Sequence, residues 1–136
     1  MKKAIFLSFV LMMIMGNYTG YGQTQKKETA NSAVNKVEAY YFHNAARCVT
    51  CKTVESEAKA DLESLYGGEV IFKALNLEDD STKPIAKQLK VSGQTLLLVK
   101  GDKKINITNE GFMYARTNPA KFKSIIKEKV DGLLNN

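Results

Sequence analysis

Apolar and polar side chains follow one another along this chain in a pattern that predicts a succession of strands and helices. Residues 37–42 and 70–77 are rich in apolar and β-forming side chains on both parities, which is typical of strands buried on both faces of a sheet. Between them, residues 48–66 carry apolar side chains three or four positions apart and predict one helix, ended by Gly67 and Gly68. The predicted buried stripe of this helix consists of Cys51, Val54, Ala58, Leu62 and Leu65.

The next part of the chain predicts a short helix followed by a hairpin. Ser81 is the predicted N-cap of this helix, and Pro84 falls in its first turn, where proline is tolerated. Residues 96–99 and 104–108 then form two strands joined by a Gly-Asp pair at 101–102, which is a hairpin signal. The second of these strands alternates apolar and polar side chains, so we expect it near a solvated edge of the sheet.

A last helix begins at Asn118 and Pro119, which suit the N-cap and the first helical position. The order of elements is therefore strand, helix, strand, helix, strand, strand, helix. A strand–helix–strand unit favours parallel pairing, whereas the hairpin must be antiparallel. We therefore predict an α/β fold in three layers, with a mixed sheet of about four strands and helices on both faces.

The first residues have the pattern of a secretory signal peptide. Lys2 and Lys3 precede an apolar run over residues 4–16, and Gly20 and Gly22 offer a small-x-small cleavage site. The run is shorter than the roughly 20 apolar residues that span a bilayer, so we expect cleavage. The predicted organisation is a signal peptide over 1–22, a flexible tether over 23–33 and a domain over 34–136. We therefore expect a protein exported to the periplasm or the extracellular space, with a membrane attachment only if the signal stays uncleaved.

Length and composition limit the classes of protein that this chain can represent. Its 136 residues and 44% hydrophobic content suit one domain with a true core. The net charge of +6 is not gathered in a basic stripe interleaved with aromatic residues, and Trp is absent, so we expect no nucleic-acid partner. The sequence indicates no organic cofactor, and we expect a monomer.

The chain contains two cysteines, Cys48 and Cys51, three positions apart at the start of the first predicted helix. Unpaired N–H groups and the helix dipole favour negative charge there, and Arg47 adds a positive charge next to Cys48. Both effects lower the pKa of an exposed thiol, and the thiolate is the reactive form. Three-residue spacing lets the second sulfur return to the first, so Cys51 can resolve a mixed disulfide formed on Cys48.

In these features the chain from about residue 34 to 134 resembles the thioredoxin-like family, in a shortened version without the family's first strand and helix. The resemblance rests on a strand, Cys-x-x-Cys at a helix start, a second strand, a helix, a hairpin and a final helix, together with residues 91–100 before and through the third core strand. It implies a thiol–disulfide oxidoreductase in which Cys48 is the nucleophile and Cys51 resolves. Protein thiols or disulfides would be its substrates, with a further redox partner that the sequence does not identify.

The chain departs from the family pattern in three places, one of which lies between the cysteines, where Val49-Thr50 replaces the familiar Gly-Pro dipeptide. The place of the family's cis-proline, in the loop where substrates dock, falls on Gln94 or Thr95, and we expect a trans peptide there because cis costs a non-proline residue about 2.5–4 kcal/mol. Phe42 stands where the family has a buried acid. Glu55 lies on the same side of the helix as the cysteines and is our candidate for relaying a proton to Cys51. The alternative is a solvated carboxylate that faces Lys52 or Lys59.

Other functions remain open at this point. Cys48 and Cys51 could bind a soft metal together with His43, although a closed zinc site needs four ligands and the chain has only this one histidine. His43 could also stabilise the Cys48 thiolate or simply hydrogen-bond at a strand end. A structural disulfide or a non-catalytic thioredoxin-like adaptor are further alternatives. Tyr40 and Tyr41, on opposite faces of the first strand, are interpreted as core aromatics.

Overall fold

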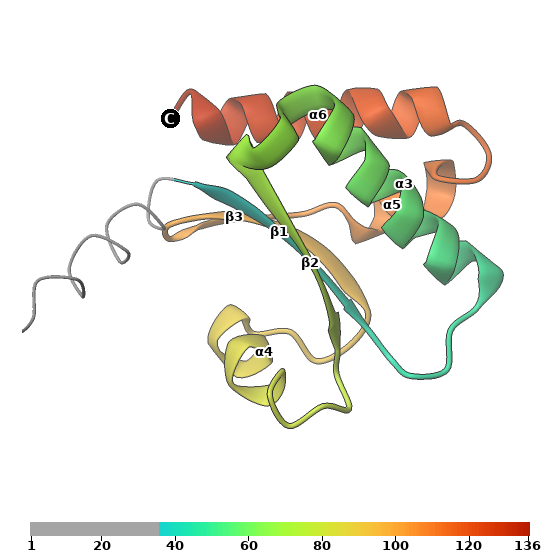
Figure 1. The fold of residues 1–136 in the computed structure, drawn as a ribbon, viewed down its shortest axis with the longest axis vertical. Coiled ribbons are helices and arrows are strands. Elements are labelled where there is room, and N and C mark those ends of the chain that lie inside the picture. The colour runs from blue at the N-terminus through green and yellow to red at the C-terminus, as the bar shows by residue number, and fades with distance from the viewer. Residues whose placement is uncertain (1–35) are drawn as a thin grey trace, which may run out of the picture. The chain divides into compact units, whose positions relative to one another are not determined.

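The computed structural model describes residues 36–136, and the predicted signal peptide and tether lie outside the described residues. The described part starts with a strand, a long helix, a single 3₁₀ turn and a second strand. A short helix, a hairpin and two further helices follow (Figure 1). The elements are β1 (Val37–His43), α3 (Val49–Tyr66), η1 (Gly67–Glu69), β2 (Val70–Asn76), α4 (Lys83–Leu89), β3 (Thr95–Lys100), β4 (Lys103–Asn106), α5 (Thr108–Tyr114) and α6 (Pro119–Leu134).

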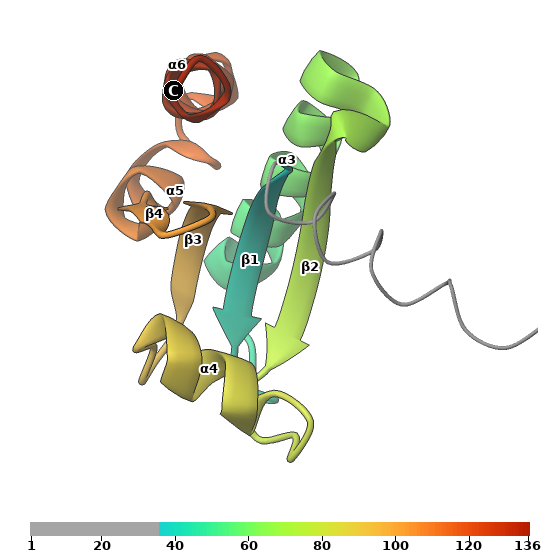
Figure 2. The same ribbon diagram turned by 90° about the vertical axis from the view of Figure 1, so that its left-hand side faces the viewer.

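The strands form one four-stranded mixed sheet in the order β2-β1-β3-β4 (Figure 2). β1 and β2 are parallel, and β3 runs antiparallel to both β1 and β4. Helices α3 and α6 cover one face of this sheet, whereas α4 lies on the other (Figure 1). The predicted α/β architecture of three layers, with a parallel first pair and an antiparallel hairpin, is confirmed.

The central strand β1 divides its side chains between two cores. Ala39 and Tyr41 belong to the cluster under α3 and α6, while Tyr40 and Phe42 belong to the cluster under α4. This division follows from the alternation of side chains along a strand. All four side chains are buried, because β1 has neighbours in the sheet on both edges and helices on both faces. The prediction of two core tyrosines on opposite faces is confirmed.

Strand β2 differs from the expectation of full burial. It forms an edge of the described sheet and pairs only with β1. Val70 is buried at its start, but Lys73 and Ala74 are exposed in its middle. An edge strand with apolar residues on both parities reads in sequence like a central one, so its position was not apparent from the pattern.

The start of α4 also differs by one residue from the prediction. Thr82, not Ser81, is the N-cap, and its side chain makes no capping hydrogen bond. Ser81 is exposed, whereas Thr82 is 3% exposed and its carbonyl accepts the first helical hydrogen bond from Ala86. Pro84 falls in the first turn, as expected.

Helix α5 was not predicted. The last strand ends at Asn106 instead of continuing to 108, because Asn106 Oδ1 accepts a hydrogen bond from the backbone N–H of Thr108. The Thr108 hydroxyl oxygen in turn accepts a hydrogen bond from the backbone N–H of Leu96, at 2.9 Å. These bonds turn the chain out of the sheet and into α5, whose Gly111 packs against α3 and α6.

Helices α3 and α6 follow their predictions closely. The stripe of α3 is buried at Cys51, Val54, Ala58 and Leu62, and Gly67 ends the helix with a positive φ of 55°. In α6, the Asn118 side chain caps the helix by accepting a hydrogen bond from the Lys121 N–H. None of the helices within residues 36–136 combines the length and the apolar character needed to cross a bilayer.

Candidate active site

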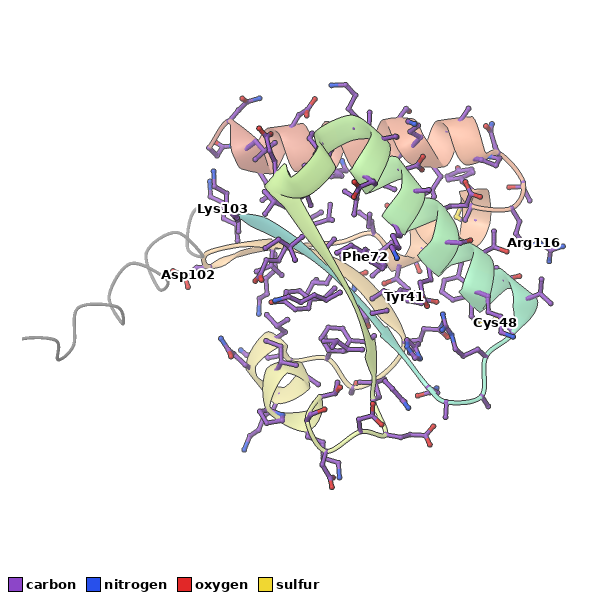
Figure 3. All side chains as sticks on the ribbon, in the orientation of Figure 1. Tyr41, Cys48, Phe72, Asp102, Lys103 and Arg116 are labelled. Atoms are coloured by element: carbon purple, nitrogen blue, oxygen red, sulfur yellow. A yellow bond between two sulfur atoms is a disulfide. The ribbon has the colours of Figure 1, made fainter. Side chains whose placement is uncertain are left out.

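The two cysteines form a disulfide at the junction between the loop after β1 and helix α3. Figure 3 shows Cys48 at this start of the helix. Their side chains differ in exposure: Cys48 is exposed, whereas Cys51 is 7% exposed and belongs to the buried stripe of α3. Only the first sulfur is therefore open to a substrate, while the second lies beneath it in the protein. This asymmetry is what an attacking and a resolving cysteine require.

Cys48 is the N-cap of α3, and its side chain performs the capping. Its Sγ accepts a hydrogen bond from the backbone N–H of Cys51 at 3.0 Å. The first turn of the helix carries no acidic residue. When the pair is reduced, a thiolate on Cys48 is stabilised by this N–H group and by the positive end of the helix dipole. Both effects lower the pKa of a thiol at this position.

Arg47 is held in place and is not freely solvated. Its Nη2 pairs with Glu55 Oε2, and its Cζ lies 5.9 Å from the centre of the Tyr41 ring. The side chain is 19% exposed, and Nε is buried without a hydrogen-bond partner. Glu55 therefore contacts Arg47, and neither Lys52 nor Lys59 is its partner. The predicted proton relay from Glu55 to Cys51 remains a hypothesis. The Glu55 carboxylate that would carry the proton is paired with Arg47.

His43 lies at the end of β1 and does not join the cysteines. Its Nδ1 is 3.0 Å from the carbonyl oxygen of Asn44, a local contact at the strand end. Within residues 36–136, no three His, Cys, Asp or Glu side chains gather as a metal-binding group. The arrangement therefore fits the interpretation of His43 as a residue that hydrogen-bonds at the strand end. Within the described residues, no third side chain joins Cys48 and Cys51 as a metal ligand.

Gln94 and Thr95 lie at the position of the expected docking loop, immediately before and at the start of β3. The peptide bonds of the described residues are all trans, as we expected at this position. Thr95 hydrogen-bonds locally to the Gly93 carbonyl oxygen. Gln94 instead reaches the site: its Nε2 donates to the Tyr41 hydroxyl, and its Oε1 lies 3.6 Å from Cys51 Sγ.

Tyr41 is a site residue that the sequence analysis treated only as core. Its ring is fully buried, and its hydroxyl donates to the Cys51 carbonyl oxygen at 2.9 Å. Burial raises the pKa of this phenol, against the opposing effects of the Gln94 hydrogen bond and the Arg47 charge. The signal in the sequence was a hydroxyl on a fully buried strand, since such a group needs a partner.

Arg116, in the turn between α5 and α6, was also missed. Its Nη1 donates to Thr50 Oγ1 at 3.4 Å, which brings a positive charge to the first turn of α3 (Figure 3). Val49 and Met113 are the large apolar side chains that the described chain exposes most, at 69% and 56%. Val49 adjoins Cys48, so the exposed sulfur has an apolar neighbour as well as cationic ones.

Solved structures of thioredoxin-like proteins resemble this chain. Trxlp from Edwardsiella tarda EIB202 aligns with a TM-score of 0.51 and 18% identity over 76% of this chain and 94% of that one. Thioredoxin O2 from Arabidopsis thaliana, in its oxidised state, aligns at 0.47 and 20% identity over 74% and 85%. The zinc-bound form of human ERp44 aligns at 0.49 and 15% identity over 78% of this chain and 30% of that one. No protein-family model matches the sequence, and no curated protein matches it.

The fold and the cysteine pair define the class. The order of elements, the mixed sheet and the likeness to the Edwardsiella structure show a thioredoxin-like fold. In this chain the fold carries a Cys-x-x-Cys disulfide, Cys48–Cys51, at the start of α3. At this level of identity the likeness concerns the fold, so the chemistry has to be argued from the site itself.

Proposed function

We propose that this protein is a thiol–disulfide oxidoreductase that exchanges disulfides with protein substrates outside the cytoplasm. One observation carries the proposal: the exposed sulfur of Cys48 accepts a hydrogen bond from the backbone N–H of Cys51 and is bonded to the buried sulfur of Cys51. A structural disulfide needs no such asymmetry, because neither of its sulfurs has to meet a substrate. The pair closes a loop of only three residues, so it also adds little to the stability of the fold.

The reaction that this geometry supports is a pair of sulfur displacements. The Cys48 thiolate attacks a substrate disulfide, a Cys48–substrate disulfide forms, and the other substrate sulfur leaves as a thiolate. Cys51 then loses its proton and attacks Cys48 Sγ, which releases the second substrate sulfur and closes the Cys48–Cys51 disulfide. The substrate gains two electrons and the cysteine pair loses two, and protons return to the released thiolates.

The same steps run backwards when the disulfide form meets a substrate dithiol. The direction depends on the reduction potential of the pair, for which 30 mV corresponds to about 1.4 kcal/mol. The cycle requires a second protein with a dithiol or a disulfide that returns the pair to its starting state. Export through the predicted signal peptide would place the reaction where disulfides persist. N-terminal sequencing of the protein recovered outside the cytoplasm tests that location.

The direct experiment combines a redox titration with trapping of the mixed disulfide. Equilibration of the purified protein with glutathione buffers should show a two-electron transition of the Cys48–Cys51 pair. The Cys51→Ser variant should accumulate a mixed disulfide with a protein substrate, and the Cys48→Ser variant, its matched control, should not. Insulin disulfide reduction at the background rate by the fully reduced protein, with no trapped species, would favour a non-catalytic adaptor and reject the proposal.

A further inference from the structure

A continuous chain of polar contacts links the buried cysteine to two side chains outside α3. The Tyr41 hydroxyl donates to the Cys51 carbonyl oxygen at 2.9 Å and accepts from Gln94 Nε2. The other end of the same amide, Gln94 Oε1, lies 3.6 Å from Cys51 Sγ. Tyr41 comes from β1 and Gln94 from the segment before β3, so the contact brings together three separate parts of the chain.

This chain of contacts determines which atom of the amide faces the sulfur. A tyrosine hydroxyl has one hydrogen, and Tyr41 gives it to the Cys51 carbonyl oxygen. The hydroxyl can therefore only accept from Gln94, which requires the NH₂ end of the amide. The oxygen end must then point toward Cys51. In the disulfide form, Cys51 Sγ carries no hydrogen, so it cannot donate a hydrogen bond to this oxygen. When the pair is reduced, the S–H group of Cys51 can donate one.

We propose that Gln94 is a positioning residue that offers its amide oxygen to the reduced Cys51 sulfur and so holds it as a neutral S–H donor, with Tyr41 fixing the orientation of the amide. The inference rests on the proposed exchange function and assigns control of its resolving step. An amide oxygen favours the thiol and repels a thiolate, whereas the N–H at Cys48 does the opposite. The fixed N–H group therefore favours a thiolate on Cys48, and the fixed amide oxygen favours a neutral thiol on Cys51.

Charged and titratable groups from several elements also face this region. Arg47 lies over the Tyr41 ring and is paired with Glu55 of α3. The His43 ring lies 6.1 Å from the Tyr41 ring, at the end of β1. Arg116, between α5 and α6, contacts the first turn of α3 at Thr50. The arginines and a protonated His43 favour a thiolate, whereas the Glu55 carboxylate and the burial of Cys51 favour the neutral thiol together with the amide oxygen, so the share of Gln94 has to be measured by substitution.

The test measures the titration of Cys51 alone, in a Cys48→Ser background, by iodoacetamide alkylation rate against pH. Gln94→Glu places an ionised carboxylate beside the sulfur and should raise the Cys51 pKa by about one unit, a tenfold fall in thiolate at fixed pH. Tyr41→Phe frees the amide to turn its NH₂ toward the sulfur and should lower the pKa by a similar amount. Tyr40→Phe, on the opposite face of the sheet, should leave it unchanged.

Opposite shifts from the Gln94 and Tyr41 variants are the expected result, with thermal unfolding confirming that each variant is folded. A shift in the same direction for both would show only a loosened site, and no shift in either would show that the amide does not act on the sulfur. Both results overturn the inference. The titration needs no exchange reaction, so it can fail while the proposed function holds, and it can succeed even if the redox titration fails.

Discussion

The backbone nitrogen of Cys51 lies 3.0 Å from the sulfur of Cys48, so the exposed cysteine caps the helix by accepting a hydrogen bond from the buried one. Because both residues lie within one turn at the start of α3, the same helix end stabilises a Cys48 thiolate and places the Cys51 sulfur within reach of a mixed disulfide formed on Cys48. The consequences can be measured on the reduced protein.

In the reduced protein, Cys48 should be alkylated at least about tenfold faster than Cys51 at neutral pH. Cys48 is exposed and its pKa should lie below the value of about 8.5 for a free thiol, while Cys51 is buried. Peptide mapping after brief iodoacetamide treatment gives both rates. In denaturant the two rates should become similar, and a faster reaction of Cys51 in the folded protein would contradict the assignment of roles.

If Glu55 relays a proton to or from Cys51, Glu55→Gln should slow the resolving step by about 100-fold, the usual scale of general acid–base catalysis. Stopped-flow measurement of the decay of the mixed disulfide across pH gives this rate. Glu63→Gln, near the other end of α3, removes the same charge away from the site and serves as the control. A normal rate in Glu55→Gln at all pH values would leave Glu55 only its contact with Arg47.

Gly111→Val should destabilise the domain by about 1–3 kcal/mol, because a side chain at this position overpacks the core. A Cβ at Gly111 would lie 3.0 Å from Val54 Cγ1 and 3.4 Å from the Phe122 ring. Gly132→Ala, in α6, meets nothing within 4 Å and should instead stabilise by up to about 1 kcal/mol through helix propensity. Chemical denaturation measures both variants, and equal effects would refute this packing of α5.

Glu38 should make the domain less stable in acid. Burial tends to raise the pKa of Glu38, but hydrogen bonds from Lys73 and Tyr40 outweigh it and leave the pKa below its ordinary value of 4.5. A carboxyl with a lowered folded pKa contributes stability above its unfolded pKa and loses it as the pH falls through the folded pKa. Relative to Glu38→Gln, the wild type should therefore lose stability as the pH is lowered from 6 to about 3, as measured by denaturation.

Asp61 should contribute a dependence of the opposite sign. Burial raises the pKa of Asp61, and its Oδ2 has no hydrogen-bond partner, although Lys123 lies 3.6 Å from Oδ1. The folded protein therefore holds the proton more tightly than the unfolded chain, so the penalty of the buried charge disappears as the pH falls. The wild type should gain stability relative to Asp61→Asn between pH 7 and about 4. A constant difference between the two would contradict this.

The sequence predicted the elements that have local signals. The stepping of apolar residues from Cys51 to Leu62 identified α3, and the Asn118-Pro119 pair located the start of α6. Helix α5 had no comparable signal, since it has only seven residues and depends on a hydrogen bond between Thr108 and Leu96, twelve positions apart. Isolated helices of this length are marginal, so packing rather than local propensity accounts for α5.

For the site, too, the sequence predicted the local features and missed the contacts between distant residues. Cys48 and Cys51 were recognisable because their spacing and their place before a helix are properties of neighbouring residues. The contact between Tyr41 and Gln94 joins residues 53 positions apart. It depends on the antiparallel register that sets Tyr41 opposite Leu96, two residues after Gln94. Even the closer pairing of Arg47 with Glu55 depended on the path of the loop that enters the helix.

By itself, the sequence determined the α/β class, the helix start that carries the cysteine pair and the division of β1 between two cores. These features follow from the spacing of apolar residues and from helix capping, which act over a few neighbouring residues and need no contact with a distant segment. The burial of Cys51 was predicted from the apolar stripe of α3, but only the tertiary structure decided which side chains surround its sulfur, because hydrogen bonds between distant segments depend on sheet register and helix packing. The chemistry of Cys51 belongs to that second group, since its partners come from β1 and from the segment before β3, which the sequence does not place side by side.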